Sequence, residues 1–173
     1  PYAASKIFAE SMCWAYGNCY NLETTTLRFT SVYGRYDIQD RVVPLFIAQA
    51  FAGKQLTVYG KQKLLDFVYI DDCIDAIECA IERRGQVSGE AVNIGSGVGT
   101  SLTELAQHMV NTIDQCPGYR VTTERTGESM QMIADLNKAN SLLGYNPTYD
   151  FEDGLAETIE WYRKHPDVVD SLG

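Results

Sequence analysis

Apolar positions along the chain alternate between helical and strand-like spacing. Ile7, Phe8 and Met12 recur at helical intervals and predict a helix over residues 2–17, ended by Gly17-Asn18. Further helices are expected at 45–51, 73–84, 101–113, 137–143 and 152–164, and strands at 24–30, 56–60, 64–70, 91–94 and 119–124. Because strands alternate with helices, the pattern predicts an α/β fold.

Local signals refine three of these boundaries. Ser101-Leu102-Thr103-Glu104 has the form of a capping box and opens the helix at 101–113. Asp71 and Asp72 are expected to form an N-cap and first helical turn, because carboxylates accept the free backbone N–H groups there. The glycine-rich run at 95–99 is interpreted as a plain turn. It follows a late strand and lacks the glycine spacing of a phosphate-binding loop.

Composition excludes several classes of function. The chain has 173 residues, 45% of them apolar, with a net charge of −9. Nucleic acid is not expected as a partner, because a phosphate backbone requires a basic surface. No apolar run approaches the roughly 18 residues of a membrane span, and no leader sequence opens the chain, so no membrane partner is expected. The five cysteines and two histidines show no zinc spacing, which favours reduced thiols, a cytoplasmic location and no metal.

Tyr2 and Lys6 are the first candidates for chemistry. They are four positions apart on a predicted helix, so they share a face. A nearby ammonium stabilises a phenolate, and a tyrosine beside it can therefore move a proton to or from a hydroxyl group. By itself this spacing is weak evidence, since many helices contain it by chance.

The surrounding sequence resembles the extended short-chain dehydrogenase/reductase family. Pro-Tyr-Ala-Ala-Ser-Lys at 1–6 is similar to its catalytic segment, and Arg-Phe-Thr-Ser-Val-Tyr-Gly at 28–34 to the turn that follows. Asp-Phe-Val-Tyr-Ile-Asp-Asp at 66–72 and Asn-Ile-Gly-Ser-Gly at 93–97 also resemble family motifs. Further similar segments, in chain order, are 43–47, 56–60, 125–128, 134–135, 138–139, 143–147 and 154–162. The resemblance therefore extends over essentially the whole chain.

This resemblance implies NAD-dependent chemistry on a nucleoside-diphosphate sugar. Tyr2 would be the acid/base, Lys6 would orient the nicotinamide ribose, and Phe29 would also contact the cofactor. In this family NAD binds an N-terminal Rossmann half and the sugar nucleotide binds a C-terminal half. The family's upstream Ser or Thr and its glycine-rich phosphate loop are not in this chain.

The resemblance also implies a set of substrate contacts. Ser31 replaces a common asparagine of the family turn, and Leu65 stands where an arginine is usual. Two readings of Lys61 and Lys63 stay open: either one of them takes over that phosphate contact, or both are solvent-exposed loop charges. Arg125 is the first choice for the diphosphate, because a guanidinium forks onto phosphate oxygens. The expected substrate-binding residues are Ser31, Arg41, Val42, Thr57, Tyr59, Lys63 and Arg125.

The implied fold is the C-terminal part of a Rossmann-type enzyme. Residues 1–34 would be a remnant of the NAD-binding domain and 35–173 mainly a small nucleotide-sugar-binding domain, with 65–95 returning to the Rossmann sheet. The abrupt start leads us to expect a truncated chain, inactive alone, although another chain could supply the missing half. The apolar stripe of the first helix is expected to form a homodimer or a larger self-association.

Epimerisation at C4 of the sugar is the favoured reaction. Two alternatives stay open, namely a nucleotide-sugar dehydratase and a nucleotide-sugar-binding fragment without activity. The sequence leaves the sugar, the base, and the choice of NAD or NADP open.

Overall fold

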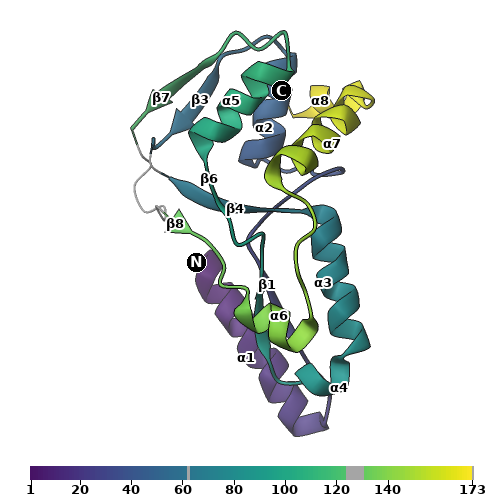
Figure 1. The fold of residues 1–173 in the computed structure, drawn as a ribbon. Helices are drawn as coiled ribbons and strands as arrows, with labels where there is room; N and C mark the ends of the chain where they lie inside the picture. The colour runs from purple at the N-terminus through teal and green to yellow at the C-terminus, as the bar shows by residue number, and fades with distance from the viewer. Residues whose placement is uncertain (62, 124–130, 173) are drawn as a thin grey trace.

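The structure, a computed structural model, describes residues 1–61, 63–123 and 131–172. Helices and strands alternate along the chain, which confirms the predicted α/β fold (Figure 1). The elements, in chain order, are α1 (Tyr2–Tyr20), β1 (Thr26–Phe29), β2 (Ser31–Tyr33), α2 (Val42–Phe51), β3 (Leu56–Tyr59), β4 (Leu64–Tyr69), α3 (Ile70–Glu82), α4 (Arg84–Val87), β5 (Ala91–Ile94), β6 (Gly99–Ser101), α5 (Leu102–Thr112), β7 (Tyr119–Thr122), β8 (Gln131–Met132), α6 (Asn137–Leu143), α7 (Phe151–Arg163) and α8 (Pro166–Ser171).

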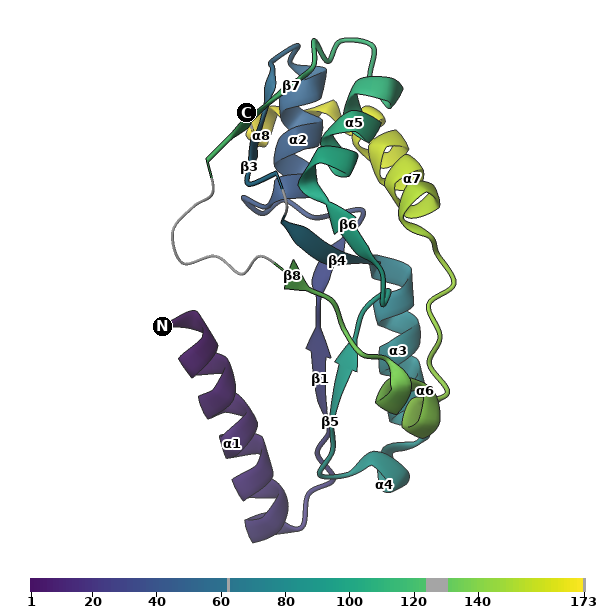
Figure 2. The ribbon, with the colours of Figure 1, turned by 60° about the vertical axis from the view of Figure 1, so that its left-hand side comes forward.

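One end of the molecule is built on the parallel pair β1–β5. Thr26 pairs with Ala91 and Phe29 with Ile94, so a strand early in the chain lies beside one about 65 residues later. Helices α3 and α6 lie on one side of this pair and α1 lies on the other (Figure 2). The buried cluster on the α3 and α6 side consists of Ala76, Ala80, Val87, Val92, Ile94, Ala139, Leu143 and Tyr145.

The other end is built around the parallel pair β3–β7 and the helices α2, α5, α7 and α8 (Figures 1 and 2). Leu56 and Val58 of β3 are fully buried against α2 and α5, because alternate strand residues point to the same face. Ile47, Leu105, Met109 and Ile159 from the helices complete this larger core.

Strand β4 joins the two ends. It pairs in parallel with β2, where Ser31 lies opposite Phe67, and antiparallel with β6. It also pairs in parallel with β8. In both views β4 crosses the middle of the molecule between the two cores. Any surface that extends from one end to the other must therefore be bounded by β4.

Two helix boundaries differ from prediction. Helix α1 continues through Gly17 to Tyr20 and ends at Asn21, which adopts a left-handed conformation at φ 54°. An interior glycine costs a helix only about 1 kcal/mol, which neighbouring hydrogen bonds can outweigh. Helix α2 starts at Val42 rather than Leu45. Pro44 is compatible with this start because the first turn needs no N–H donor at its position.

Two local interpretations were partly wrong. Gly99, the last residue of the turn predicted at 95–99, belongs to strand β6, which pairs with Leu64–Asp66 of β4. Asp71 and Asp72 lie in the first turn of α3 as predicted, but the N-cap is Tyr69. The Asp72 carboxylate instead accepts hydrogen bonds from the backbone N–H of Thr148 (2.8 Å) and Tyr149 (3.3 Å). Both differences arise from long-range pairing, which local signals do not encode. The capping box is confirmed, because Ser101 Oγ accepts from Glu104 N and Glu104 Oε2 accepts from Ser101 N.

Two features are absent from the described residues, namely a membrane-spanning helix and a group of metal-ligating side chains. No helix among them is long and apolar enough to cross a membrane. Within the same residues, no group of three or more His, Cys, Asp or Glu could hold a metal ion. The five cysteines are free thiols.

Candidate active site

A cavity of about 470 Å³ lies beside Tyr2. Strand β2 contributes Ser31, and the start of α2 contributes Val42 together with the preceding Arg41. Four predicted residues from three parts of the sequence, namely Tyr2, Ser31, Arg41 and Val42, are thus brought together. The other lining residues are Thr30, Val32, Asp37, Val43, Pro44 and Phe67.

A second cavity of about 390 Å³ adjoins the first. The predicted residues Val42, Thr57, Tyr59 and Lys63 line it, with Asp40, Leu45, Phe46, Gln49, Leu65 and Leu102. Val42 belongs to both linings, so both cavities lie against the start of α2. We call the first the tyrosine cavity and the second the strand cavity.

Tyr2 and Lys6 lie one turn apart on α1. The Lys6 Nζ atom is 5.4 Å from the centre of the Tyr2 ring, so an ammonium stands close to the phenol. Tyr2 is 75% exposed, and its phenol is therefore reachable from solvent as well as from the cavity. This arrangement can transfer a proton to or from a hydroxyl group held in the tyrosine cavity.

Two of the predicted residues that the structure describes line neither cavity, and a third lies outside the described residues. Lys6 faces Tyr2 rather than a cavity, and Phe29 is exposed at the end of β1. Arg125, the expected diphosphate contact, lies outside the described residues. Their predicted roles toward cofactor and diphosphate stay predictions.

The tyrosines behind the site differ from Tyr2 in their environment. Burial raises the pKa of Tyr33, whose hydroxyl donates to the carbonyl oxygen of Phe151 at 3.3 Å. Burial, together with the hydrogen bond to Glu157, raises the pKa of Tyr69 to about 12. Both phenols stay protonated at neutral pH and act as hydrogen-bond donors within the core. Tyr2 is the tyrosine of this region placed for proton transfer.

The loop that carries Arg41 is fixed at its other end by an ion pair. Arg35 donates to both carboxylate oxygens of Asp71, at 2.5 and 3.0 Å. The hydrogen bonds to this carboxylate raise the pKa of Arg35, so its guanidinium stays charged. This pair connects the start of the loop to the first turn of α3.

The glycine-rich turn at 95–99 is not a phosphate-binding loop, as predicted. The N–H groups of Ser96 and Gly97 already donate to the buried carboxylate of Asp66. A phosphate at this turn would have to displace a fully buried anion.

Six lining residues gave no clear sequence signal. Their side chains come from a loop and three elements that meet only after folding, so spacing along the chain does not reveal them. They are Thr30, Asp37, Asp40, Gln49, Phe67 and Leu102.

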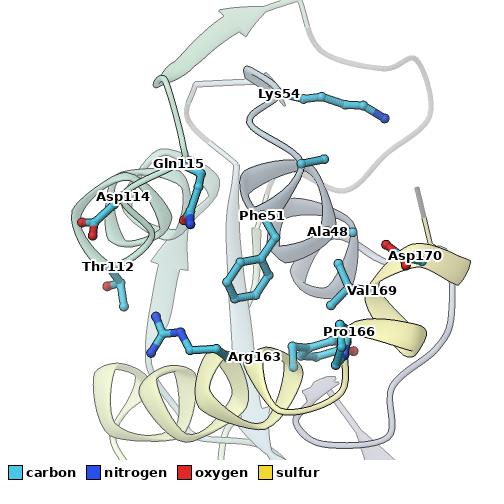
Figure 3. A pocket seen from close by; sticks show the side chains of 12 residues that line it. Ala48, Phe51, Lys54, Thr112, Asp114, Gln115, Arg163, Pro166, Val169 and Asp170 are labelled. Atoms are coloured by element: carbon cyan, nitrogen blue, oxygen red, sulfur yellow. The ribbon is translucent and has the colours of Figure 1, made fainter.

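A larger cavity, of about 800 Å³, lies between α2, α5, α7 and α8 (Figure 3). Phe51 and Val169 form part of its apolar wall, while Lys54, Arg163 and Asp170 bring charges of both signs. None of the predicted site residues that the structure describes lines it. Its size alone therefore does not make it the candidate active site.

A helix carrying Tyr2 and Lys6 lies beside a parallel strand pair, and two cavities share the start of α2. The sequence model of the NAD dependent epimerase/dehydratase family matches residues 1–95. The chain belongs to this family.

Individual relatives agree. The chain is 31% identical to dTDP-glucose 4,6-dehydratase of Xanthomonas campestris pv. campestris, over 94% of this chain and 49% of that protein. It is similar to the structure of UDP-glucose 4-epimerase from Thermotoga maritima with UDP-glucose, at 30% identity and a TM-score of 0.88, covering 96% and 54% of the two chains. It is also similar to dTDP-glucose 4,6-dehydratase DesIV of Streptomyces venezuelae with NAD bound, at 30% identity and a TM-score of 0.89, covering 100% and 54%. The chain spans about half the length of the relatives it matches.

Proposed function

We propose that this chain supplies the nucleotide-sugar site and the proton-transfer tyrosine of an enzyme that epimerises a nucleoside-diphosphate sugar at C4, with NAD as cofactor. The observation that carries this proposal is that two cavities share Val42 as a lining residue. Tyr2 lies at one end, and Thr57 and Tyr59 lie at the other. A nucleotide sugar has the same two-part form, with the sugar at one end and the nucleoside at the other.

The residues around Tyr2 fit the nicotinamide end of NAD. Tyr2 and Lys6 present a phenol and an ammonium one turn apart on an exposed helix, where both can bond to a ribose. NAD, when bound, supplies the hydride acceptor that oxidises the sugar carbon and later returns the hydride. Its diphosphate needs further contacts, because the glycine-rich turn of this chain is already engaged by Asp66.

Each residue of the tyrosine cavity has a distinct task in this reaction. Tyr2 takes the proton from the sugar hydroxyl, and Lys6 stabilises the resulting phenolate. The hydroxyl of Ser31 and the guanidinium of Arg41 hold oxygens of the glycosyl phosphate. Phe67 is buried and forms an apolar wall that excludes water on one side of the sugar.

We further propose that a second α/β unit packs along the β1 edge of the β1–β5 pair, against α1 on one side of the pair and α3 on the other. None of the side chains of α1 (Tyr2–Tyr20, all described) is buried, and Phe8 and Trp14 are exposed. Ile74, Ile77 and Ile81 of α3 are exposed as well. A parallel strand pair such as β1–β5 is normally covered on both faces. A Rossmann half bound there would complete the sheet and the NAD site, and the α1 stripe that it leaves open would form a homodimer.

The domain division proposed for the intact enzyme follows from this completion. Residues 1–34 would belong to the NAD-binding domain and 35–173 mainly to the sugar-nucleotide domain, with 65–95 returning to the first. The parallel pairing of β1 with β5 supports that return. The five free thiols support a cytoplasmic location.

Two other functions have support from specific observations. The similarity to dTDP-glucose 4,6-dehydratases favours a dehydratase, in which water is lost next to the oxidised carbon. The lack of any buried side chain on α1 (Tyr2–Tyr20, all described) favours a nucleotide-sugar-binding chain that is inactive until the second unit binds. Product analysis with the completed enzyme separates the first alternative from epimerisation.

Isothermal titration of the chain tests the binding part directly. The ligands are UDP, UDP-glucose, dTDP-glucose, GDP-mannose and NAD. We expect one nucleotide sugar to bind and NAD to bind weakly or not at all. An Arg41→Gln variant should bind the nucleotide sugar more weakly. The control is Arg84→Gln, which changes an arginine distant from both cavities and should leave the affinity unchanged. Equal binding to both variants would contradict the proposed site.

A further inference from the structure

Asp66 is a completely buried carboxylate in the middle of β4. Its Oδ1 atom accepts hydrogen bonds from the backbone N–H and the hydroxyl of Ser96, both at 2.7 Å. Its Oδ2 atom accepts from the N–H groups of Gly97 and Ala134, both at 3.1 Å. One side chain thus joins three segments that are far apart in the sequence. A buried anion with four donors is strongly held, because losing any donor leaves its charge uncompensated.

The neighbours of Asp66 on β4 face the site. Leu65 lines the strand cavity and Phe67 lines the tyrosine cavity. Because successive strand residues point to opposite faces, Asp66 lies behind the wall that Leu65 and Phe67 form. The carboxylate therefore anchors the part of the wall that spans both cavities.

The surroundings of Asp66 leave little room for movement. A Cβ atom added to Gly95 would collide with Asp66 Oδ2, and it would lie 2.9 Å from two side-chain atoms of Thr30. Thr30 in turn lines the tyrosine cavity next to Ser31. The turn at 95–97 is thus packed between Asp66 and the residues that begin the tyrosine cavity.

We propose that Asp66 is a positioning residue that sets the spacing between the tyrosine cavity and the strand cavity. It thereby sets the distance between Tyr2 and the nucleoside of a bound nucleotide sugar. The effect of Asp66 on the ligand rests on the proposed function, whereas its position behind Leu65 and Phe67 does not. Asp66 touches neither substrate nor cofactor; it acts through Leu65 and Phe67.

An Asp66→Asn variant tests the wall without any ligand. The amide replaces one acceptor by a donor that faces two N–H groups, so the anchor is lost with little change in volume. We expect the NMR signals of the Leu65 methyls and the Phe67 ring to shift. The matched control is Asp72→Asn, because Asp72 is also a buried carboxylate, bonded to Thr148 and Tyr149, but lines neither cavity. In the control, those two sets of signals should stay in place.

Titration tests the spacing. In the proposed site, UDP-glucose and dTDP-glucose would occupy both cavities, whereas UMP and dTMP would occupy only the strand cavity. Asp66→Asn should lower the affinity for the nucleotide sugar by about tenfold or more, because a small displacement between the two halves of a site is costly. The affinity for the mononucleotide should change by less than about threefold. A general loss of protein stability would lower the affinity for both kinds of ligand equally, and this is the result expected for Asp72→Asn. Ser96→Ala, which removes only one of the four donors, should act in the same direction as Asp66→Asn but less strongly.

Two outcomes would overturn the proposal. One is a folded Asp66→Asn protein with unchanged Leu65 and Phe67 signals; the other is an equal loss of both ligand types. If Asp66→Asn does not fold, Ser96→Ala decides by the same two measurements. If the unmodified chain binds no nucleotide ligand, the proposed function fails, and the NMR comparison still decides whether Asp66 positions the wall.

Discussion

Glu10 of α1 and Arg28 of β1 form a two-pronged ion pair, with Nη2 to Oε2 at 2.5 Å and Nε to Oε1 at 2.9 Å. The pair fixes the helix that carries Tyr2 and Lys6 against the strand that ends at Phe29. Hydrogen bonding between the two charges lowers the pKa of Glu10 and raises that of Arg28. Because α1 has no buried side chain, apolar packing does little to fix its orientation, and the ion pair contributes to it instead.

The orientation of α1 should therefore depend on pH. Because the folded pKa of Glu10 is lowered, the ion pair is intact above the ordinary glutamate pKa of about 4.3 and is lost as the pH falls through the lower folded value. The protection of α1 amides against hydrogen exchange, taken relative to the intrinsic rate at each pH, should fall below about pH 4, and Glu10→Gln should show the same loss of protection at pH 7.

The control for this prediction is Glu23→Gln. Glu23 lies just after α1 and faces Arg84 at 3.8 Å without a hydrogen bond, so its removal should leave α1 exchange unchanged. Identical exchange in Glu10→Gln and the unmodified chain would show that something other than the ion pair orients α1.

Catalysis in the completed enzyme should depend on Tyr2 far more than binding does. Tyr2→Phe removes the proton-transferring oxygen but keeps the ring, so kcat should fall by about 10²- to 10⁴-fold. Nucleotide-sugar affinity should change little, because the phenol is at the edge of the tyrosine cavity. Steady-state kinetics together with equilibrium binding measures both. A variant with near-normal kcat would assign proton transfer to another group.

The sequence predicted elements whose signals are satisfied locally. Helix α5 begins where Ser101 and Glu104 predict, and α6 lies at 137–143 as expected because its apolar spacing and Gly144 are local signals. Strand β6 was missed because it contains only three residues and is held by β4, some 35 positions earlier. The role of Asp72 was misassigned for the same reason, since its partners are at Thr148 and Tyr149.

The site divides in a similar way. Resemblance to a family located Tyr2, Ser31 and Val42, because their motifs are contiguous in sequence. Gln49 and Leu102 were missed although both line the strand cavity, because α2 and α5 meet only in the folded core. Periodicity identifies residues like Leu102 as core and cannot distinguish a core wall from a cavity wall.

The capping box of α5 should be worth a measurable part of the stability. Ser101→Ala removes the acceptor for Glu104 N and should lower the free energy of unfolding by about 1 kcal/mol. The backbone N–H of Ser101 and, second to it, the Ser101 side chain lower the pKa of Glu104, and Ser101→Ala removes the second of these contributions. This contribution is therefore present above about pH 4.3 and is lost as the pH falls through the lower folded value. Urea unfolding of Ser101→Ala and of the unmodified chain at pH 7 and at pH 3 should give a difference that shrinks in acid.

Gly95→Ala should be among the most damaging small substitutions. Its new methyl group would collide with the buried carboxylate of Asp66 and press on the side chain of Thr30. Neither can retreat easily, because Asp66 is held by four donors and Thr30 N is bonded to Ile94 O at 2.9 Å. Overpacking of this kind costs about 1–3 kcal/mol, and urea unfolding should show it. Gly85→Ala is the matched control, since a Cβ there would meet only Glu23 Oε1 at 3.7 Å and alanine favours a helix. Equal stability of the two variants would mean that the turn at 95–97 can move away from Asp66, and the spacing of the two cavities would then not be fixed by that carboxylate.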